Sequence, residues 1–309
     1  MLPLSDYTPE DFALPATSVT ERLKAPVRRY LYPVYNLLVH RWLTRKYRDC
    51  ALRPDQWLWG NRGNDYARNR LRVDRFLPLA GKDILVVGCG SGRDMACWLP
   101  YDPARLVAVD YLNYDRAWCC MREFVQSQYP ATTLDFRQAD ITNLSQFLNA
   151  SFDVVGSDAV FEHVTDIGSA LQEMYRLLRP GGILYASYGP LWQCWGGDHI
   201  SGFDGIAAGY NHLLLEPETY RQYLDEPRRK ANCNSLYADH GLFSYLRAAD
   251  YLAALADAGF DRLFCGIIIE PKAVRCLKVH PKLKERLCKL YAEMDLIMDG
   301  MTVIYRKPA

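Results

Sequence analysis

The chain has 309 residues, 50% of them hydrophobic, and its 37 Lys and Arg residues nearly balance its 36 Asp and Glu residues. This length is enough for one large α/β domain with additions or for two small domains. The balanced charge argues against a nucleic-acid partner, because binding to a phosphate backbone usually leaves a basic footprint.

Membrane-spanning and secreted proteins are also disfavoured by the sequence. No apolar run approaches the roughly 20 residues that cross a bilayer. The start of the chain, Met1–Asp6, lacks the basic and apolar segments of a secretory signal. The 10 cysteines form no Cys-x-x-Cys pair, which disfavours zinc ribbons and thioredoxin-like sites. We therefore expect reduced thiols and a cytoplasmic location.

Residues 1–75 are predicted to form an N-terminal helical extension that closes over the main domain as a lid. Within it, helices are predicted over 27–48 and 65–77. A basic amphipathic helix at 27–48 would suit a membrane surface, although a solvated helix face is the commoner case and the one we prefer. The apolar residues of this helix near one face are Leu31, Val34, Leu38 and Trp42, and the basic residues of the other are Arg28, Arg29, Arg41, Arg45 and Lys46.

From residue 76 to 309, short apolar runs alternate with segments of helical periodicity, which predicts βαβ units and a parallel sheet. The chain end adds two strands separated by a helix, which fits a reversed final strand. The sequence thus predicts a doubly wound α/β fold with a mostly parallel sheet. The predicted strands are 84–87, 106–109, 134–137, 152–156, 182–188, 264–269 and 301–306, and the predicted helices are 94–99, 114–128, 144–148, 167–178, 243–258 and 281–298.

A glycine-rich turn follows the first of these strands, with Gly88, Cys89, Gly90 and Gly92 in sequence. Glycines at such a turn let the backbone bend tightly and let a ligand approach the main chain. A dinucleotide-binding turn would have a third glycine three residues after the second, where this chain has Arg93. The turn therefore favours a different adenosine ligand.

Carboxylates follow the next two strands. Asp110 comes after Gly88 at close to the spacing of about 20 residues at which an acidic side chain accepts both ribose hydroxyls. Asp140 and Ile141 follow the third strand, where a carboxylate can accept from the adenine amino group beside an apolar neighbour. Ser157 and Asp158 end the fourth strand. Since ligands of open α/β sheets bind outside the carboxyl ends of the strands, we expect these side chains to share one site.

Five segments in this order resemble the class I methyltransferases that use S-adenosylmethionine: the glycine turn, Asp110, Asp140-Ile141, 152–164 and Leu177–Leu184. The resemblance covers about 82–188 and implies a seven-stranded sheet with an antiparallel last strand. It implies that the glycine turn surrounds the methionine part of the cofactor and that Asp110 takes the ribose hydroxyls with Tyr111 against the adenine. It also implies that Asp140 and Ile141 recognise the adenine edge and that Ser157 or Asp158 lies beneath the cofactor's amino group.

The segment 189–237 is an insertion after the fifth strand, where we expect the pocket for a small-molecule methyl acceptor. Candidate acceptor-binding residues are Tyr188, Trp192, Asp198, Tyr210 and His212. If the acceptor must lose a proton, His199 or His163 is the candidate general base. We expect no metal, because the spacing of Asp198, His199 and His212 matches no metal motif.

The leading functional hypothesis is therefore a small-molecule methyltransferase acting on an oxygen, nitrogen, carbon or sulfur atom. The alternative of another class is a cofactor-binding regulatory protein of the same fold without turnover. A nicotinamide-dependent dehydrogenase is disfavoured by Arg93, and a membrane-surface protein would rest on 27–48. The sequence makes no prediction about oligomeric state.

Overall fold

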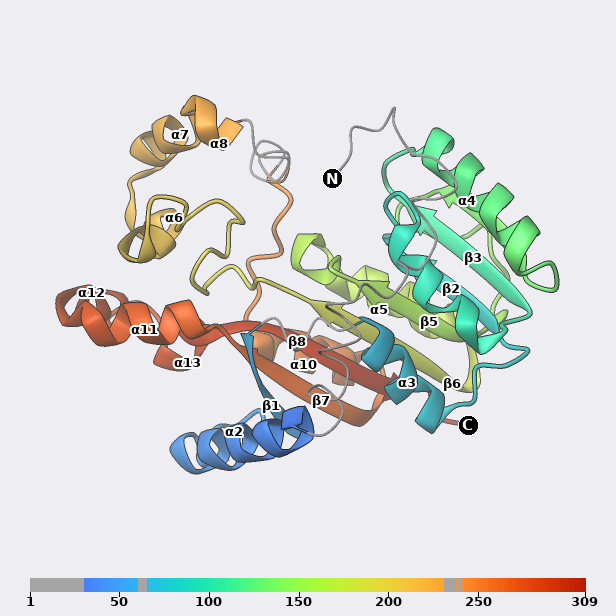
Figure 1. Ribbon diagram of the computed structural model, residues 1–309, viewed down its shortest axis with the longest axis horizontal. Helices are drawn as coiled ribbons and strands as arrows, with labels where there is room; N and C mark the ends of the chain where they lie inside the picture. The colour runs from blue at the N-terminus through green and yellow to red at the C-terminus, as the bar shows by residue number, and fades with distance from the viewer. Residues whose placement is uncertain (1–30, 61–65, 231–236, 238–240) are drawn as a thin grey trace.

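A computed structural model of the protein describes residues 31–60, 66–230, 237 and 241–309. Part of the predicted lid, 1–30, lies outside these residues, with Arg28 and Arg29 of the predicted basic face. Residues 31–60 lie along one edge of the sheet (Figure 1). The lid therefore stays a prediction.

A single mixed sheet forms the centre of the described structure, in the order β1-β7-β8-β6-β5-β2-β3-β4. All neighbouring strands are parallel except β8, which runs antiparallel to both β6 and β7. The reversed final strand is therefore confirmed. The strands are β1 (Gln56–Trp59), β2 (Asp83–Val87), β3 (Arg105–Asp110), β4 (Thr133–Gln138), β5 (Phe152–Asp158), β6 (Leu178–Tyr188), β7 (Asp261–Ile269) and β8 (Met298–Arg306).

The mostly parallel α/β fold is confirmed, but the strand count of seven was wrong because β1 adds an eighth strand. β1 has only four residues and pairs with the outer edge of β7, from Gln56 opposite Gly266 to Trp59 opposite Ile269. Asp55 fixes its start by accepting from the backbone N–H of Cys265 at 2.7 Å. So short a strand has too few alternating positions to stand out in the sequence.

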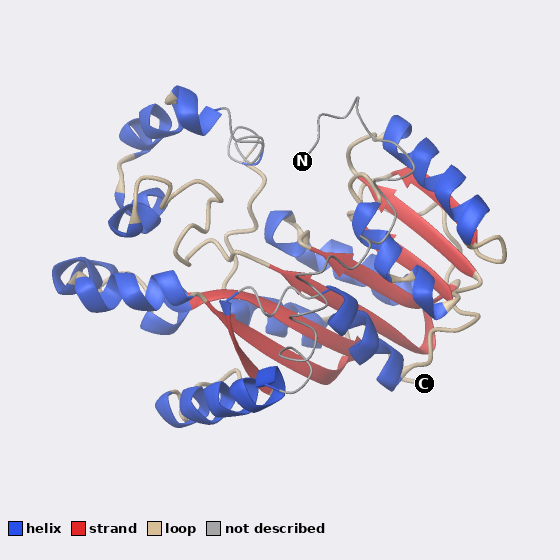
Figure 2. Cartoon of the chain, viewed as in Figure 1, coloured by secondary structure: helices blue, strands red, loops and turns tan. Residues whose placement is uncertain are grey.

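Helices cover both faces of the sheet (Figure 2), as the doubly wound prediction requires. One face packs on α3, α4 and the 3-10 helices η4 and η5, and the other packs on α5, α10 and α11. The helices are α2 (Tyr32–Lys46), α3 (Tyr66–Phe76), η4 (Arg93–Cys97), η5 (Leu99–Tyr101), α4 (Asp115–Gln128), η6 (Phe161–His163), α5 (Ile167–Leu177), η7 (Ile206–Tyr210), α6 (Asn211–Leu214), α7 (Pro217–Asp225), α8 (Pro227–Lys230), α10 (Ala248–Asp257), α11 (Pro271–Val279), α12 (Pro281–Cys288) and α13 (Glu293–Ile297).

Two predicted helices were wrong. Residues 144–148 form turns because side chains of α5 take their backbone groups. Glu173 accepts from Leu144 N–H at 2.7 Å, and Arg176 donates to the carbonyls of Leu144 and Phe147. The helix predicted over 281–298 is divided into α12 and α13.

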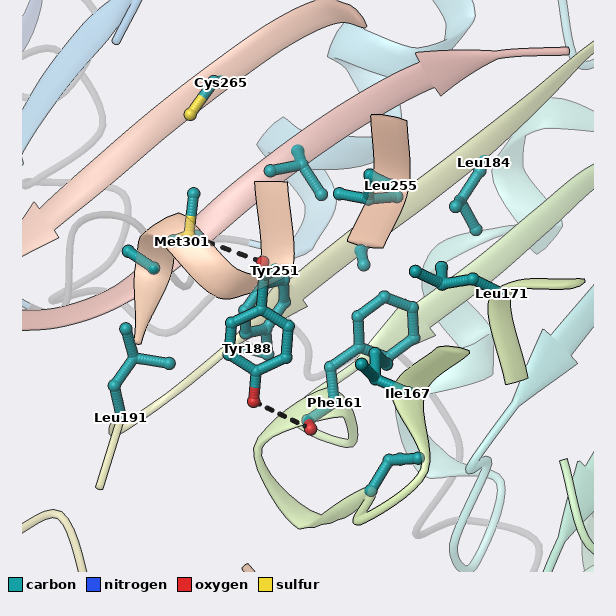
Figure 3. Close-up of a cluster of buried hydrophobic side chains, with 14 of the residues drawn as sticks. Phe161, Ile167, Leu171, Leu184, Tyr188, Leu191, Tyr251, Leu255, Cys265 and Met301 are labelled. Atoms are coloured by element: carbon teal, nitrogen blue, oxygen red, sulfur yellow. Dashed lines mark hydrogen bonds between the residues drawn. The ribbon is translucent and has the colours of Figure 1, made fainter. Parts of the chain in front are cut away.

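The insertion after β6 holds η7, α6, α7 and α8, and Figure 1 shows the last three as a lobe beside the sheet. The insertion begins directly after Tyr188, which belongs to the core cluster of Figure 3. In this cluster Phe161, Tyr188 and Tyr251 pack together. The Tyr188 hydroxyl donates to Met301 Sδ at 3.4 Å, and the Tyr251 hydroxyl donates to the Phe161 carbonyl at 3.0 Å. Within the described ranges, no helix has the length and apolar character needed to cross a membrane.

Arg70 joins α3 to the sheet through a buried ion pair with Asp158 at the end of β5. Its guanidinium also lies over the rings of Trp98 at 4.0 Å and Tyr185 at 4.8 Å. The Asp158 carboxylate accepts in addition from the Tyr185 hydroxyl at 2.6 Å. A charged side chain with no solvent contact is tolerated here because the carboxylate and both rings surround it.

Replacing Arg70 by Ala should lower the free energy of unfolding by about 3–5 kcal/mol, because Asp158 would remain buried without its counter-charge. Urea denaturation of the two proteins measures the difference. Arg221→Ala is the matched control, since its pair with Glu218 is exposed and should contribute almost nothing. Equal losses in both variants would contradict this view of the Arg70 pair.

Candidate active site

The glycine turn after β2 has a backbone that only glycine adopts readily. Gly88, Gly90 and Gly92 have φ values of +69°, +52° and +92°. A Cβ on Gly88 would lie 2.2 Å from Val160, whereas one on Gly90 would meet no atom of the described residues within 4 Å. The turn is thus closed toward β5 and open above Gly90, where a ligand can approach the main chain.

Asp110, at the tip of β3, touches this turn directly. Its carboxylate accepts from the backbone N–H of Gly90 at 2.7 Å and of Leu112 at 2.9 Å. Burial raises the pKa of Asp110, and these backbone hydrogen bonds lower it. The two strongest sequence signals therefore meet at neighbouring strand ends, as the parallel pairing of β2 and β3 requires.

Aromatic packing supports the turn from below. Trp118 of α4 donates from Nε1 to the Gly90 carbonyl at 2.8 Å and stacks on Phe136 of β4, with ring centroids 5.3 Å apart. Cys89 is buried in the same cluster, and burial raises the pKa of its thiol. The Cys89 thiol is therefore a packing group rather than a reactive thiolate.

Beyond β4, Asp140 lies beside the tip of β3, since Ala139 N–H donates to the Asp110 carbonyl at 2.8 Å. The Asp140 carboxylate is exposed and accepts from the backbone and hydroxyl of Thr142. Ile141 is buried, and Tyr111 is 64% exposed. The edge predicted to hold the adenine thus has an exposed carboxylate and an exposed aromatic ring.

Ser157 and Asp158, at the end of β5, differ in their hydrogen-bond partners. Ser157 is opposite Val87 in the sheet, one residue before the glycine turn, and its buried hydroxyl has no hydrogen-bond partner in the described chain. Asp158 is already paired with Arg70 and Tyr185. Of these two neighbours, Ser157 retains the capacity for a ligand.

The two candidate bases lie together, although 36 positions separate them in the sequence. The rings of His163 and His199 are 5.0 Å apart, and Tyr237 stacks on His163 at 3.9 Å. His163 Nδ1 is 2.7 Å from the Leu242 carbonyl, which can only accept, so Nδ1 carries the proton and Nε2 has a free lone pair. Burial lowers the pKa of His163 and lowers that of His199 to about 4, so both rings are neutral at pH 7.

Other predicted acceptor residues are engaged within the structure. Tyr188 lies in the core, and the hydroxyl of the buried Tyr210 donates to the Leu296 carbonyl at 2.8 Å. Asp198 organises the insertion by accepting from Ser201 and from the Tyr220 hydroxyl at 2.7 Å. Its carboxylate is thus used within the insertion.

His212 and Trp192 also belong to the interior of the insertion. His212 Nε2 donates to the Trp192 carbonyl at 2.7 Å, and burial lowers the pKa of His212. The Trp192 ring is only partly buried and packs on Phe243 and Tyr245 next to the two candidate bases. In the described ranges, no three His, Cys, Asp or Glu side chains are placed to hold a metal ion.

Glu162 is a feature that sequence reasoning did not assign. It is 3% exposed, and neither carboxyl oxygen has a hydrogen-bond partner among the described residues. Burial is the main cause that raises its pKa from 4.5 to about 8. The backbone N–H groups of Glu162 and Gly189 oppose this rise, and the nearby carboxyls of Asp299 and Asp158 add to it. The only sequence signal was an acidic residue beside His163 within an otherwise apolar segment.

Comparisons with known proteins agree with this geometry. Residues 85–186 match the family model described as a methyltransferase domain. A Mycolicibacterium smegmatis protein assigned as an S-adenosylmethionine-dependent methyltransferase is 37% identical over 108 residues, covering 35% of this chain and 38% of that protein. The ubiquinone biosynthesis O-methyltransferase of Pseudomonas putida is 28% identical over 159 residues, covering 50% of this chain and 60% of that protein.

A solved structure from Galdieria sulphuraria, assigned as a sarcosine dimethylglycine methyltransferase, has a TM-score of 0.50 at 12% identity. It covers 79% of this chain and 86% of that one, and it supports the fold alone. The chain spans less than two thirds of the length of these two curated relatives. The fold and the matched segment define a Rossmann-like methyltransferase domain. Similarity over this segment supports a class I, S-adenosylmethionine-dependent methyltransferase domain.

The buried acid Glu162 should make stability depend on pH. Because its folded pKa is raised from 4.5 to about 8, the unfolded carboxyl ionises first as pH rises, and stability falls across this interval. Glu162→Gln cannot titrate, so it should gain stability relative to the natural protein between pH 5 and pH 8. Urea denaturation at both values measures this. A pH-independent difference would show that Glu162 is not held protonated.

Proposed function

We propose that this protein transfers the methyl group of S-adenosylmethionine to a small-molecule acceptor by in-line displacement. The observation that carries this proposal is the 2.7 Å contact between the Gly90 N–H and the Asp110 carboxylate, inside a segment that matches the methyltransferase domain. The open space above Gly90 and the unpartnered Ser157 hydroxyl fit a ligand at the same edge of the sheet.

In this proposal the glycine turn, with Gly88, Cys89, Gly90 and Gly92, lies along the methionine part of the cofactor. Asp110 accepts from the ribose hydroxyls with the lone pairs that Gly90 and Leu112 leave free. The adenine is held by the exposed residues Tyr111 and Asp140 above the buried Ile141. Ser157, rather than Asp158, receives the amino group, because Arg70 already neutralises Asp158.

The bound cofactor would supply a methyl group on a positively charged sulfur, which is a good leaving group, so the protein mainly has to position the acceptor. In this proposal the acceptor lies beside His199 and Trp192 of the insertion and beside His163 of η6. Buried aromatic rings around them exclude water from the transfer.

His163 is the proposed general base. Its Nδ1–H is fixed by the Leu242 carbonyl, so the lone pair on Nε2 can take the proton that the acceptor loses as the new bond to the methyl carbon forms. His199 Nε2 has no partner among the described residues and would orient the acceptor. A base at this position favours a hydroxyl acceptor, in agreement with the O-methyltransferase among the relatives.

Asp110→Ala should weaken S-adenosylmethionine binding at least about tenfold, because a charged acceptor of two hydroxyls is lost. Isothermal calorimetry measures this, with NAD as the competing ligand class. Asp135→Ala is the matched control, since this half-buried carboxylate of β4 pairs with Arg137. Unchanged affinity in Asp110→Ala, or tight binding of NAD alone, would contradict the proposed cofactor site.

His163→Ala should reduce kcat of methyl transfer about 10²–10⁴-fold while leaving cofactor affinity unchanged, because only proton removal is lost. A screen of hydroxylated acceptors with labelled methyl donor supplies the assay. His280→Ala, at the start of α12 and outside the site, is the control. Full activity of His163→Ala, with a normal pH profile, would show that another group is the base.

A further inference from the structure

Helix α2 presents a row of large apolar side chains to solvent. The sequence predicts the apolar residues near one face of this helix and the basic residues on the other, and it favours a solvated basic face. Instead, the apolar residues themselves are exposed, at Leu31 (61%), Val34 (56%), Leu37 (48%), Leu38 (59%) and Trp42 (48%). Their spacing places them on one continuous face, and a soluble helix normally turns such a face toward the core.

The opposite face of α2 holds the helix in this orientation. Leu43 is 1% exposed and packs in the core, and Asn36 is buried on the same side. His40 Nδ1 accepts from the backbone N–H of Trp57 in β1 at 3.1 Å. The exposed apolar row therefore cannot rotate inward without losing the attachment of the helix to the sheet.

Positive charge accompanies this apolar face. Arg41 and Arg45 are exposed on the same arc, and Lys46 Nζ lies 5.6 Å from the ring of Trp42. No acidic residue occurs between positions 31 and 48. The face is thus apolar and cationic together, with an indole ring at its border.

A hollow of about 600 Å³ between α2 and α3 extends the charged region. Arg68, Arg72 and Arg75 line it, together with Leu37 and the 46% exposed Leu71. Its acidic residue, Asp55, already accepts from Arg262 at 3.2 Å and from the Cys265 backbone. Three arginines and one aspartate therefore line the hollow next to the apolar row.

We propose that this α2 face docks on an anionic phospholipid bilayer. Leu31, Val34, Leu38 and Trp42 enter the boundary between headgroups and acyl chains, and Arg41 and Arg45 contact lipid phosphates. A second copy of the chain fits less well, because a two-fold contact would bring the same arginines against each other. Such binding lies on the membrane surface and needs no spanning helix.

The test is vesicle flotation of the full chain, with phosphatidylcholine vesicles and with vesicles that also contain phosphatidylglycerol. The protein should float with the anionic vesicles only. Arg41→Gln/Arg45→Gln should weaken binding about 25-fold, since each surface cation contributes about 1 kcal/mol. Leu38→Asn/Trp42→Ala should abolish flotation. Leu148→Asn/Leu290→Asn, which removes two even more exposed apolar residues elsewhere, should change nothing.

The alternatives give different results. Displacement by inorganic phosphate at constant ionic strength would show that the arginines bind free phosphate rather than lipid. Loss of a dimer in Leu38→Asn/Trp42→Ala, by sedimentation velocity, would show that a second copy covers the face. Absence of flotation with the anionic vesicles would show that the face does not bind an anionic lipid surface. Any of these three outcomes overturns the proposal.

Discussion

The parallel pairing of β2 with β3 is the constraint from which the site follows. It brings the glycine turn and Asp110 to the same edge, where the Gly90 N–H can donate to the carboxylate. β5 pairs with the other side of β2, so Ser157 meets the turn from the opposite direction. Strand order reverses at this point, and the crevice that such a reversal leaves is where α/β sheets bind their ligands.

The strands and turns around β2, β3 and β5 could be predicted from the sequence because each depends on residues that are close together in the chain. A buried strand, a turn that needs positive φ and an acid at a strand tip each leave a mark within a few residues. The misses came from distant partners. Arg176 takes the backbone groups of 144–148, which prevents a helix there. The pairing of Asp158 with Arg70 and the meeting of His163 with His199 likewise depend on tertiary contacts that no local pattern contains.

Burial leaves few charges on the side of the site that is proposed to hold the acceptor. Desolvation raises the pKa of Glu162 to about 8 and that of Asp299 to about 7, and it lowers the pKa of His163 and His199. Near pH 7, Glu162 therefore stays largely protonated, Asp299 is about half protonated, and both histidines are neutral. The imidazole that is proposed to take a proton is therefore in its basic form before the acceptor arrives.

The short strand β1 has a consequence for how the chain can be divided. It covers the outer edge of β7 from Gly266 to Ile269, a buried and almost wholly aliphatic stretch. A shortened protein starting near residue 85, where the matched domain begins, would leave that edge unpaired. Unpaired aliphatic edges recruit strands from other molecules, so such a fragment would be prone to aggregate. The segment before the matched domain thus protects the edge of the sheet by pairing with it in the same molecule.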